Sequence, residues 1–341
     1  MQGKVVVVAG GSAGIGLATA RTCAAEGADV AMLARGRERL EPAAAEVGER
    51  AVPITCDLVS PDSVRAALQK IKEKLVTGAT PDADRGKLQT EIAKIVGAID
   101  PRPEDRLVEI GPGLGAITMP LLARVNELHA IEIDRDAIRH LHALAAGRGT
   151  LHIHEADVLR FDLASLRNDA RRLRIVGNLP YNICTPLLFR LIEQREHLAD
   201  LHVMLQKEVI ERMAAGPNTE HYGRLSVMLA PWLRVEPLFD IGPGAFKPAP
   251  RVVSTFARLT PHASPPISTA HPREYAAVVA AAFSQRRKTL RNALKALLTE
   301  REIAAAGIEP GVRAETVSPA GYARLAAQLA AKSSTAASHG A

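Results

Sequence analysis

Aromatic residues, cysteine and long apolar runs are all scarce in this sequence. Phe, Tyr and Trp make up 3% of the 341 residues while hydrophobic residues reach 47%, so the core is expected to be aliphatic. The three cysteines (Cys23, Cys56 and Cys184) have no metal-ligand spacing, which favours reduced thiols and predicts no metal site. No apolar run approaches the length of a membrane span, and VVVVAG near the N-terminus is too short for a signal peptide. The sequence therefore predicts a cytoplasmic protein without a membrane partner.

Length and charge narrow the possibilities further. A chain of 341 residues is too long for one small core and predicts two or three domains. The charged fraction of 23% is ordinary for a globular protein. The formal charge of +6 and the pI of about 9.4 mildly favour a polyanionic partner.

Residues 1–68 have the pattern of a partial dinucleotide fold, with strand, glycine-rich turn, helix, strand, helix and strand in succession. The glycine run at 10–16 follows a buried strand and opens a helix, which lets a pyrophosphate approach the helix N-terminus. Arg35 follows the second strand and would suit a 2′-phosphate, and Asp57 follows the third and could meet an adenine. Half of a doubly wound sheet would leave one strand edge unpaired.

This segment resembles the opening of the short-chain dehydrogenase/reductase family through its Gly-x-x-x-Gly-x-Gly spacing, although Ala9 stands where that family has Thr. The proton-transfer motif of the family, Tyr-x-x-x-Lys, is missing. None of the four tyrosines has a lysine four residues further on: Tyr181, Tyr222, Tyr275 and Tyr322. An NADP-dependent reductase is therefore the least favoured function, and we expect no saturable binding of NADPH by this segment.

Residues 69–87 are predicted to be a linker, because the stretch TGATPDADRG at 77–86 is rich in turn residues. Apolar residues then recur at helical spacing over 88–99, and DPRP at 100–103 ends that helix. Strands and helices alternate through the rest of 88–260. This alternation predicts a domain with a mainly parallel sheet covered by helices on both faces.

Glycines and polar residues collect where successive strands of this domain end. They are Glu109, Gly111, Gly113, Gly115, Glu132, Asp157 and Asn178. The carboxyl ends of parallel strands share one edge of the sheet, which is where open α/β sheets bind ligands. One acidic strand end alone is usually a helix cap or a solvated turn. Four polar strand ends in register indicate a nucleotide site, in which Glu132 can hold ribose hydroxyls and Asp157 can accept from an adenine amine.

The fourth strand end continues as Asn178-Leu179-Pro180-Tyr181. The side-chain oxygen of Asn178 and the backbone carbonyl near Pro180 are both acceptors and could hold an adenine N6 amine, while Tyr181 could stack on the ring. The alternative for this tetrapeptide is an Asn-Pro turn followed by a core tyrosine.

Several longer motifs extend this pattern over residues 90–330. They are VEIGPGLGAIT at 108–118, IEIDRD at 131–136, EADVL at 155–159, GNLPYNICTPLLF at 177–189, AFKPAPRVVS at 245–254 and FSQRRKTLRNAL at 283–294. This set resembles the small-subunit rRNA adenine N6,N6-dimethyltransferases. The resemblance implies a Rossmann-like class I methyltransferase fold with a mainly parallel seven-stranded sheet and a small α-helical C-terminal domain. It also implies S-adenosylmethionine as cofactor and dimethylation of adenosines, two adjacent ones in the 3′-terminal hairpin of small-subunit rRNA, during ribosome biogenesis. We expect a monomer.

The resemblance also implies roles for single residues. Cofactor contacts fall on Glu109, on the loop with Gly111, Gly113 and Gly115, on Glu132 at the ribose, on Asp157 at the adenine and on Asn178. Asn178 and Pro180 would hold the target amine, Tyr181 would stack on the target base, and Phe246 would close on its other face. For Phe246, anchoring a loop between two prolines is an equal alternative.

The C-terminal region is predicted to bind RNA. A Pro/Ser-rich linker at 261–270 precedes a helical domain at 271–330, and residues 331–341 are predicted to be a disordered tail. Five cations are predicted to share one helix without an acidic neighbour: Arg286, Arg287, Lys288, Arg291 and Lys295. A charge run is usually a solvated helix face, but behind a nucleotide-binding domain it favours phosphate contacts.

One departure from the family pattern keeps a second function open. The family has Phe-Gly-Gln-Asn-Phe-Leu just before the helix expected at 88–99, in a segment that folds over the cofactor, and here the corresponding residues are DADRGKLQ. A non-catalytic RNA-binding assembly factor is therefore the alternative to an active methyltransferase.

Overall fold

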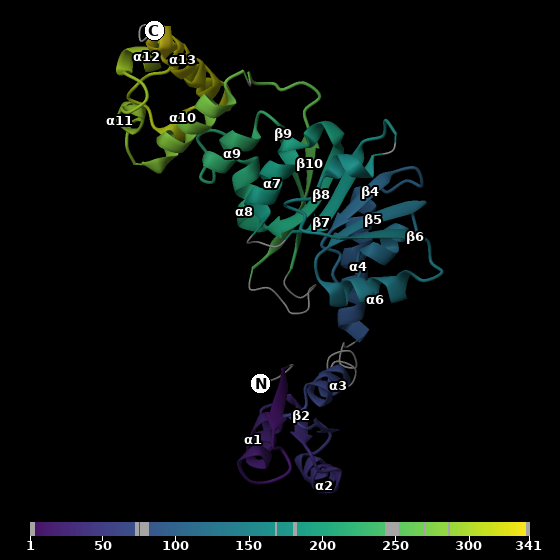
Figure 1. Cartoon of the computed structure of the whole chain (residues 1–341). Helices are drawn as coiled ribbons and strands as arrows, with labels where there is room; N and C mark the ends of the chain where they lie inside the picture. Colours follow the sequence, from purple (N-terminus) through teal and green to yellow (C-terminus); the bar gives the residue numbers. More distant parts are fainter. Residues whose placement is uncertain are drawn as a thin grey trace. The chain divides into compact units, whose positions relative to one another are not determined.

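The computed structural model describes residues 4–71, 75, 82–167, 169–179, 183–242, 252–268, 270–285 and 287–338. The chain divides into two compact units, Met1–Lys87 and Leu88–Ala341, and each is described here by itself. Most of their elements are labelled in Figure 1.

Three parallel strands and three helices make up residues 4–71 of the first unit. Strands β1 (Val5–Ala9), β2 (Asp29–Ala34) and β3 (Ala51–Thr55) are paired in the order β1-β2-β3. Val30 and Met32 of β2 share a core with α1 (Gly14–Ala25) and α2 (Arg37–Val47). Ala31 and Leu33 share a second core with α3 (Pro61–Ile71) on the other face. The central strand therefore reads as a continuous apolar run because both of its faces are covered.

Helices extend into residues 69–87 from both sides. Helix α3 continues to Ile71, with Ala67 and Ile71 buried against the second core. Helix α4 (Asp82–Ile99) begins inside the stretch that was expected to be a linker. The predicted free edge is present: in the described part of the chain β1 pairs only with β2, and Val5 and Val7 are 37% and 48% exposed.

A seven-stranded sheet forms the centre of the second unit, in the order β6-β5-β4-β7-β8-β10-β9. The strands are β4 (Arg106–Ile110), β5 (Glu127–Glu132), β6 (Thr150–Glu155), β7 (Leu173–Asn178), β8 (Leu198–Gln206), β9 (Leu233–Ile241) and β10 (Ser254–Pro261). β4 to β8 pair in parallel, and β10 runs antiparallel to both β8 and β9. The predicted α/β class with a mainly parallel seven-stranded sheet is confirmed. The strand order reverses at β4, the position at which open α/β sheets bind ligands.

Helices cover both faces of this sheet (Figure 1). On one face, α4, α5 (Thr118–Leu122) and the end of α6 (Arg135–Ala145) share a core with Leu107 and Val176. On the other face, α7 (Cys184–Glu193) and α8 (Lys207–Ala214) share a core with Val108 and Ile175. The helix that follows the glycine turn is short, because after Leu122 the chain turns back to begin β5 at Glu127.

The C-terminal helices are α10 (Pro272–Ser284), α11 (Leu290–Leu294), α12 (Glu300–Ala305) and α13 (Pro319–Ser338). They share one core with Tyr222 and with Val227 of α9 (Arg224–Leu229). The buried hydroxyls of Tyr222, Tyr275 and Tyr322 donate to backbone carbonyls at 2.8, 2.9 and 2.8 Å. The disordered tail predicted for 331–341 is wrong up to Ser338, because α13 continues to that residue.

None of the described helices is long and apolar enough to cross a membrane. Within the same residues, no group of three or more His, Cys, Asp or Glu side chains is arranged to hold a metal ion.

Candidate functional site

The polar strand ends predicted from sequence lie next to each other in the second unit. Ile110 at the end of β4 pairs with Ile131 of β5 on one side and with Gly177 of β7 on the other. Glu132 at the end of β5 pairs with Glu155 of β6. The loops that follow β4, β5, β6 and β7 therefore leave the sheet at one edge, around the point where the strand order reverses.

The glycine turn after β4 depends on backbone conformations that favour glycine. Gly111, Gly113 and Gly115 have φ values of +65°, +55° and +81°. A Cβ added at Gly111 or Gly113 would meet no atom within 4 Å, so the turn leaves open space above its backbone.

Glu132, at the end of β5, connects this turn to its own strand end through hydrogen bonds. Its carboxylate accepts the backbone N–H of Gly113 at 3.1 Å, of Ile133 at 2.8 Å and of Asp134 at 2.9 Å. A carboxylate has about four lone-pair sites, so three of them already hold the two loops. Sequence reasoning placed a ribose ligand here and did not predict this structural role.

Glu109 is a buried carboxyl beneath the turn, with a side chain that is only 4% exposed. Burial raises the pKa of Glu109 to about 7, the nearby Glu132 carboxylate raises it further, and the Thr118 hydroxyl lowers it. Its Oε2 atom has no hydrogen-bond partner among the described residues. A buried and incompletely paired carboxyl next to a glycine turn of this kind is typical of a functional site. Thr118 was missed by sequence reasoning, since nothing in the pattern singled it out.

The side chains of Asp157 and Asn178 differ in their hydrogen bonding. Asp157 follows β6 in a turn, where its Oδ1 accepts the backbone N–H of Leu159 at 3.0 Å and 42% of its side chain is exposed. Asn178 ends β7 with an exposed side chain for which no hydrogen bond is found among the described residues. Gly177 before it packs tightly, since a Cβ there would lie 2.9 Å from the Ile110 carbonyl oxygen and from Leu179. The close strand pairing holds the Asn178 backbone while its amide remains free to bind a ligand.

Comparison with known proteins decides which family this arrangement belongs to. The family model for ribosomal RNA adenine dimethylase matches residues 87–331, which is more than half of the chain. The chain belongs to the ribosomal RNA adenine dimethylase family. A second family model, for short chain dehydrogenase, matches residues 4–79.

Relatives of this dimethylase family align over most of their own length. Ribosomal RNA small subunit methyltransferase A of Methylococcus capsulatus is 54% identical over 238 residues, covering 70% of this chain and 92% of that protein. The protein of the same name from Pseudomonas syringae is 49% identical over 241 residues, covering 71% and 90%. A dimethyladenosine transferase from Plasmodium falciparum, 22% identical, has the same fold with a TM-score of 0.60 over 72% of this chain and 96% of that one. The 23S rRNA methyltransferase ErmE, 25% identical, has a TM-score of 0.56 over 71% and 97%.

Four residues predicted for the site of this dimethylase lie outside the residues that the structure describes. They are Pro180, Tyr181, Phe246 and Arg286. Their roles at the target base and at the RNA stay predictions.

The prediction that the five C-terminal cations share one helix is wrong. Helix α10 ends at Ser284 and α11 begins only at Leu290, so Arg287 and Lys288 lie in the connection between them. The connection is held away from helical geometry because the N–H of Leu290 donates to the Val312 carbonyl at 2.7 Å. The four cations that the structure describes are nevertheless all exposed and near one another in the sequence: Arg287, Lys288, Arg291 and Lys295. Arg291 has a counter-charge that sequence reasoning did not foresee, Glu300 at 3.8 Å.

Sequence reasoning also missed a histidine cluster inside the sheet. The Nδ1 atom of His129 in β5 lies 3.0 Å from Nε2 of His154 in β6, and its ring stacks on His152 at 4.8 Å between centroids. Burial lowers the pKa of His129 to about 4, with His152, His154 and Arg106 acting in the same direction and Glu127 opposing them. The sequence signal that could have revealed this cluster is the histidines at alternating positions in LHAIE at 128–132 and LHIHE at 151–155.

Proposed function

We propose that this chain dimethylates the N6 amine of adenosines in small-subunit rRNA with S-adenosylmethionine as donor, and so contributes to ribosome biogenesis. Two adjacent adenosines in the 3′-terminal hairpin are the expected targets, and the protein acts as a cytoplasmic monomer. Membership of the dimethylase family and the names of the matched relatives support this proposal. The observation that carries it is the free side-chain amide of Asn178, at the strand end next to the glycine turn.

The residues present fit S-adenosylmethionine, which when bound supplies an electrophilic methyl group on its sulfonium. The open space over Gly111 and Gly113 leaves the loop backbone accessible to the methionine part. The remaining acceptor capacity of Glu132 suits a ribose hydroxyl, and the second carboxylate oxygen of Asp157 suits an adenine amine. Glu109, buried with one unpartnered oxygen, places an acceptor beneath the loop.

Asn178 would orient the target. The base must leave its stack to reach the edge of the sheet, after which the Asn178 carboxamide oxygen can accept one N6–H. That hydrogen bond directs the nitrogen lone pair toward the donor and fixes the approach, so positioning supplies most of the acceleration. No strong general base is required, because the N6 proton becomes acidic once the nitrogen is alkylated.

Exposed cations in the α10–α11 connection and at the end of α11 support an RNA partner. Arg287, Lys288 and Lys295 can each neutralise a phosphate, and binding that depends on them would weaken as salt rises. One sequence observation favours a second candidate function, a non-catalytic RNA-binding assembly factor: the Phe-Gly-Gln-Asn-Phe-Leu segment of the family is missing.

Nucleoside mass spectrometry separates the two functions. The full chain and S-adenosylmethionine are incubated with small-subunit particles that lack the modification, and N6,N6-dimethyladenosine is measured. We expect Asn178→Ala to slow transfer about 100-fold or more while the Kd for S-adenosylmethionine changes less than about 3-fold. Asn126→Ala is the matched control, because this exposed asparagine precedes β5 at the opposite ends of the strands. RNA binding without any dimethyladenosine would contradict the enzymatic proposal, and equal loss of binding and transfer in Asn178→Ala would contradict the role of that residue.

A further inference from the structure

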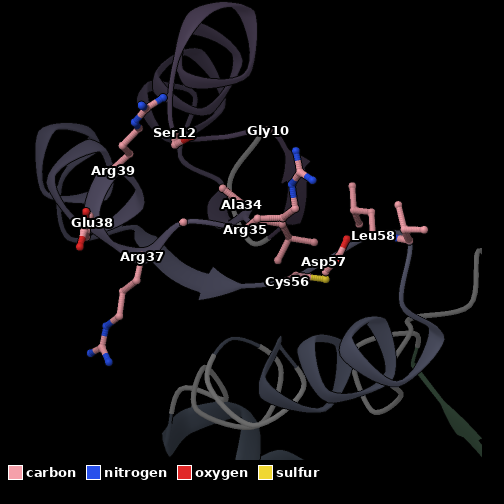
Figure 2. A pocket seen from close by; sticks show the side chains of 13 residues that line it. Gly10, Ser12, Ala34, Arg35, Arg37, Glu38, Arg39, Cys56, Asp57 and Leu58 are labelled. Carbon is pink, nitrogen blue, oxygen red and sulfur yellow. Dashed lines mark hydrogen bonds between the residues drawn. The ribbon is translucent and has the colours of Figure 1, made fainter.

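The carboxyl ends of β1, β2 and β3 lie around a cavity of about 870 Å³ in the first unit (Figure 2). Arg35 and Asp57, predicted from sequence to meet a 2′-phosphate and an adenine, both line it. In the second unit, the corresponding edge of the sheet carries a group of polar side chains to which the sequence pattern assigned no role. This group lies beside β8, on the side of Asn178 away from the glycine turn.

Three strands meet at this corner of the sheet. β8 is the neighbour of β7, and Asn178 pairs with Met204. β8 ends at Gln206, where antiparallel β10 begins at Ser254, and β9 ends beside them because Ile241 also pairs with Ser254. Neighbouring strands lie about 4.8 Å apart. The corner therefore begins one strand away from the residue expected to hold the target amine.

Lys207, Asp240 and Thr255 form a hydrogen-bonded network at the corner. The Lys207 ammonium donates to Oδ2 of Asp240 at 2.6 Å, and the Thr255 hydroxyl donates to Oδ1 at 2.6 Å. The hydrogen bond from Lys207 lowers the pKa of Asp240, and the same bond raises the pKa of Lys207, so both groups are charged at neutral pH. Their side chains are 46% and 44% exposed. The pair is therefore fixed in position and still accessible to a ligand.

This pair offers donors and acceptors side by side. An ammonium has three donors and a carboxylate about four lone-pair sites, so both groups keep free capacity after their mutual bond and the bond from Thr255. A ribose 2′-hydroxyl is both a donor and an acceptor, and matches such a pair. A phosphate would face the Asp240 carboxylate and also that of Glu211, one turn along α8, which acts on the pKa of Lys207 as well. A neutral hydroxyl therefore suits the corner better than a phosphate.

The corner also has an apolar surface. Val252 and Val253 immediately precede β10 and are 41% and 39% exposed. Val253 is tied to the network, because its carbonyl accepts the backbone N–H of Lys207 at 3.0 Å. Apolar side chains beside a few placed polar groups are typical of ligand sites. Here they can contact the carbon atoms of a sugar whose hydroxyl meets the charged pair.

We propose that the Lys207–Asp240 pair recognises the ribose 2′-hydroxyl of a nucleotide next to the target adenosine, and so restricts the substrate to RNA at that nucleotide. Lys207 donates to the hydroxyl oxygen, Asp240 accepts from the hydroxyl, and Val253 contacts the sugar carbons. The proposal rests on the proposed dimethylation of an adenosine held at Asn178. A deoxyribose would leave both charged groups without the partner that the hydroxyl provides, which weakens binding.

Site-specific removal of single 2′-hydroxyls tests this proposal. Small-subunit particles that lack the modification are assembled with a 3′ hairpin ligated from synthetic RNA, which carries one 2′-deoxynucleotide at each position next to a target adenosine in turn. The Kd of the full chain for each particle is measured with S-adenosylhomocysteine present. We expect one of these substitutions to weaken binding about 10-fold. In Lys207→Met the same substitution should change the Kd less than about 2-fold, whereas Lys207→Arg, which keeps donors, should retain most of the effect.

Lys94→Met is the matched control, because Lys94 is a half-exposed lysine of the same unit that pairs with Glu91 at 2.9 Å on α4. It should keep the full dependence on the 2′-hydroxyl, and Asp240→Ala should lose it as Lys207→Met does. Equal Kd values for all particles, or the same dependence in Lys207→Met and the unaltered chain, would overturn the proposal. Absence of dimethyladenosine would contradict the enzymatic function alone, because the Kd comparison needs no methyl transfer. Circular dichroism of the variants should match that of the unaltered chain, since the exchanged side chains are about half exposed.

Discussion

Replacing Glu109 with glutamine should change how the stability of the second unit depends on pH. Glu109 is 4% exposed, and burial raises its pKa from 4.5 to about 7, helped by the neighbouring Glu132 carboxylate. Glutamine has nearly the same shape but cannot ionise. Comparing the two proteins over a pH range therefore isolates the cost of the buried charge from any constant difference in packing.

The sign and size of this effect follow from proton linkage. Below pH 4.5 the Glu109 carboxyl is protonated in both the folded and the unfolded chain, so its full contribution to stability is present. As pH rises through about 7, the folded chain must ionise a buried carboxyl, and that contribution is lost. A pKa rise from 4.5 to about 7 corresponds to about 3 kcal/mol in the free energy of unfolding. Between pH 5 and pH 9 we expect Glu109→Gln to gain about this amount relative to the unaltered protein.

Urea unfolding followed by tryptophan fluorescence is the appropriate assay. Trp232 is the single tryptophan of the chain and lies in the second unit, with the Arg195 guanidinium 4.4 Å from its ring centroid. Its signal reports the unit that contains Glu109 even if the first unit unfolds separately. Contributions from histidines are common to both proteins and cancel in the difference when they act independently.

Glu155→Gln is the matched control, because this half-exposed carboxylate is the register partner of Glu132 and pairs with Arg135 at 2.6 Å. Its stability difference should stay within about 0.5 kcal/mol from pH 5 to pH 9. A flat difference for Glu109→Gln as well would refute the reasoning, since it would mean that the buried carboxyl has another partner or is reached by water.

Three other changes have expected outcomes. Glu132→Gln should weaken S-adenosylmethionine binding about tenfold in calorimetry, because an amide donor would face backbone N–H donors, while Glu155→Gln should not. Gly177→Ala should lower the free energy of unfolding by about 1–3 kcal/mol, against less than about 1 for Gly216→Ala, where a Cβ meets nothing within 4 Å. His129 should contribute a loss of stability as pH falls from 6.5 toward 4, because the unfolded chain binds a proton that the buried ring does not. In urea titrations the stability of His129→Gln relative to the unaltered protein should therefore rise as pH falls over this range, and a constant difference would contradict this.

The site at the strand ends could be predicted because it depends on short sequence patterns. Buried-strand runs end at Ile110, directly after Glu109, at Glu132 and at Asn178, and the parallel topology brings such ends to one edge whatever the details of packing. The basic cluster was less predictable. Whether its cations shared a helix depended on the Leu290 N–H reaching the Val312 carbonyl, a contact between segments that sequence periodicity does not connect.

By itself, the sequence determined the α/β class, the positions of the glycine turns, the family and the polar residues available to the site. These follow from short-range periodicity and from motifs whose chemistry is local. Only the tertiary structure decided what those residues do to each other: the three N–H groups held by Glu132, the raised pKa of Glu109, the counter-charge of Arg291 and the cavity closed by half a sheet. The physical reason is that hydrogen bonds, desolvation and cavities depend on distances between residues far apart in the chain, which only folding establishes.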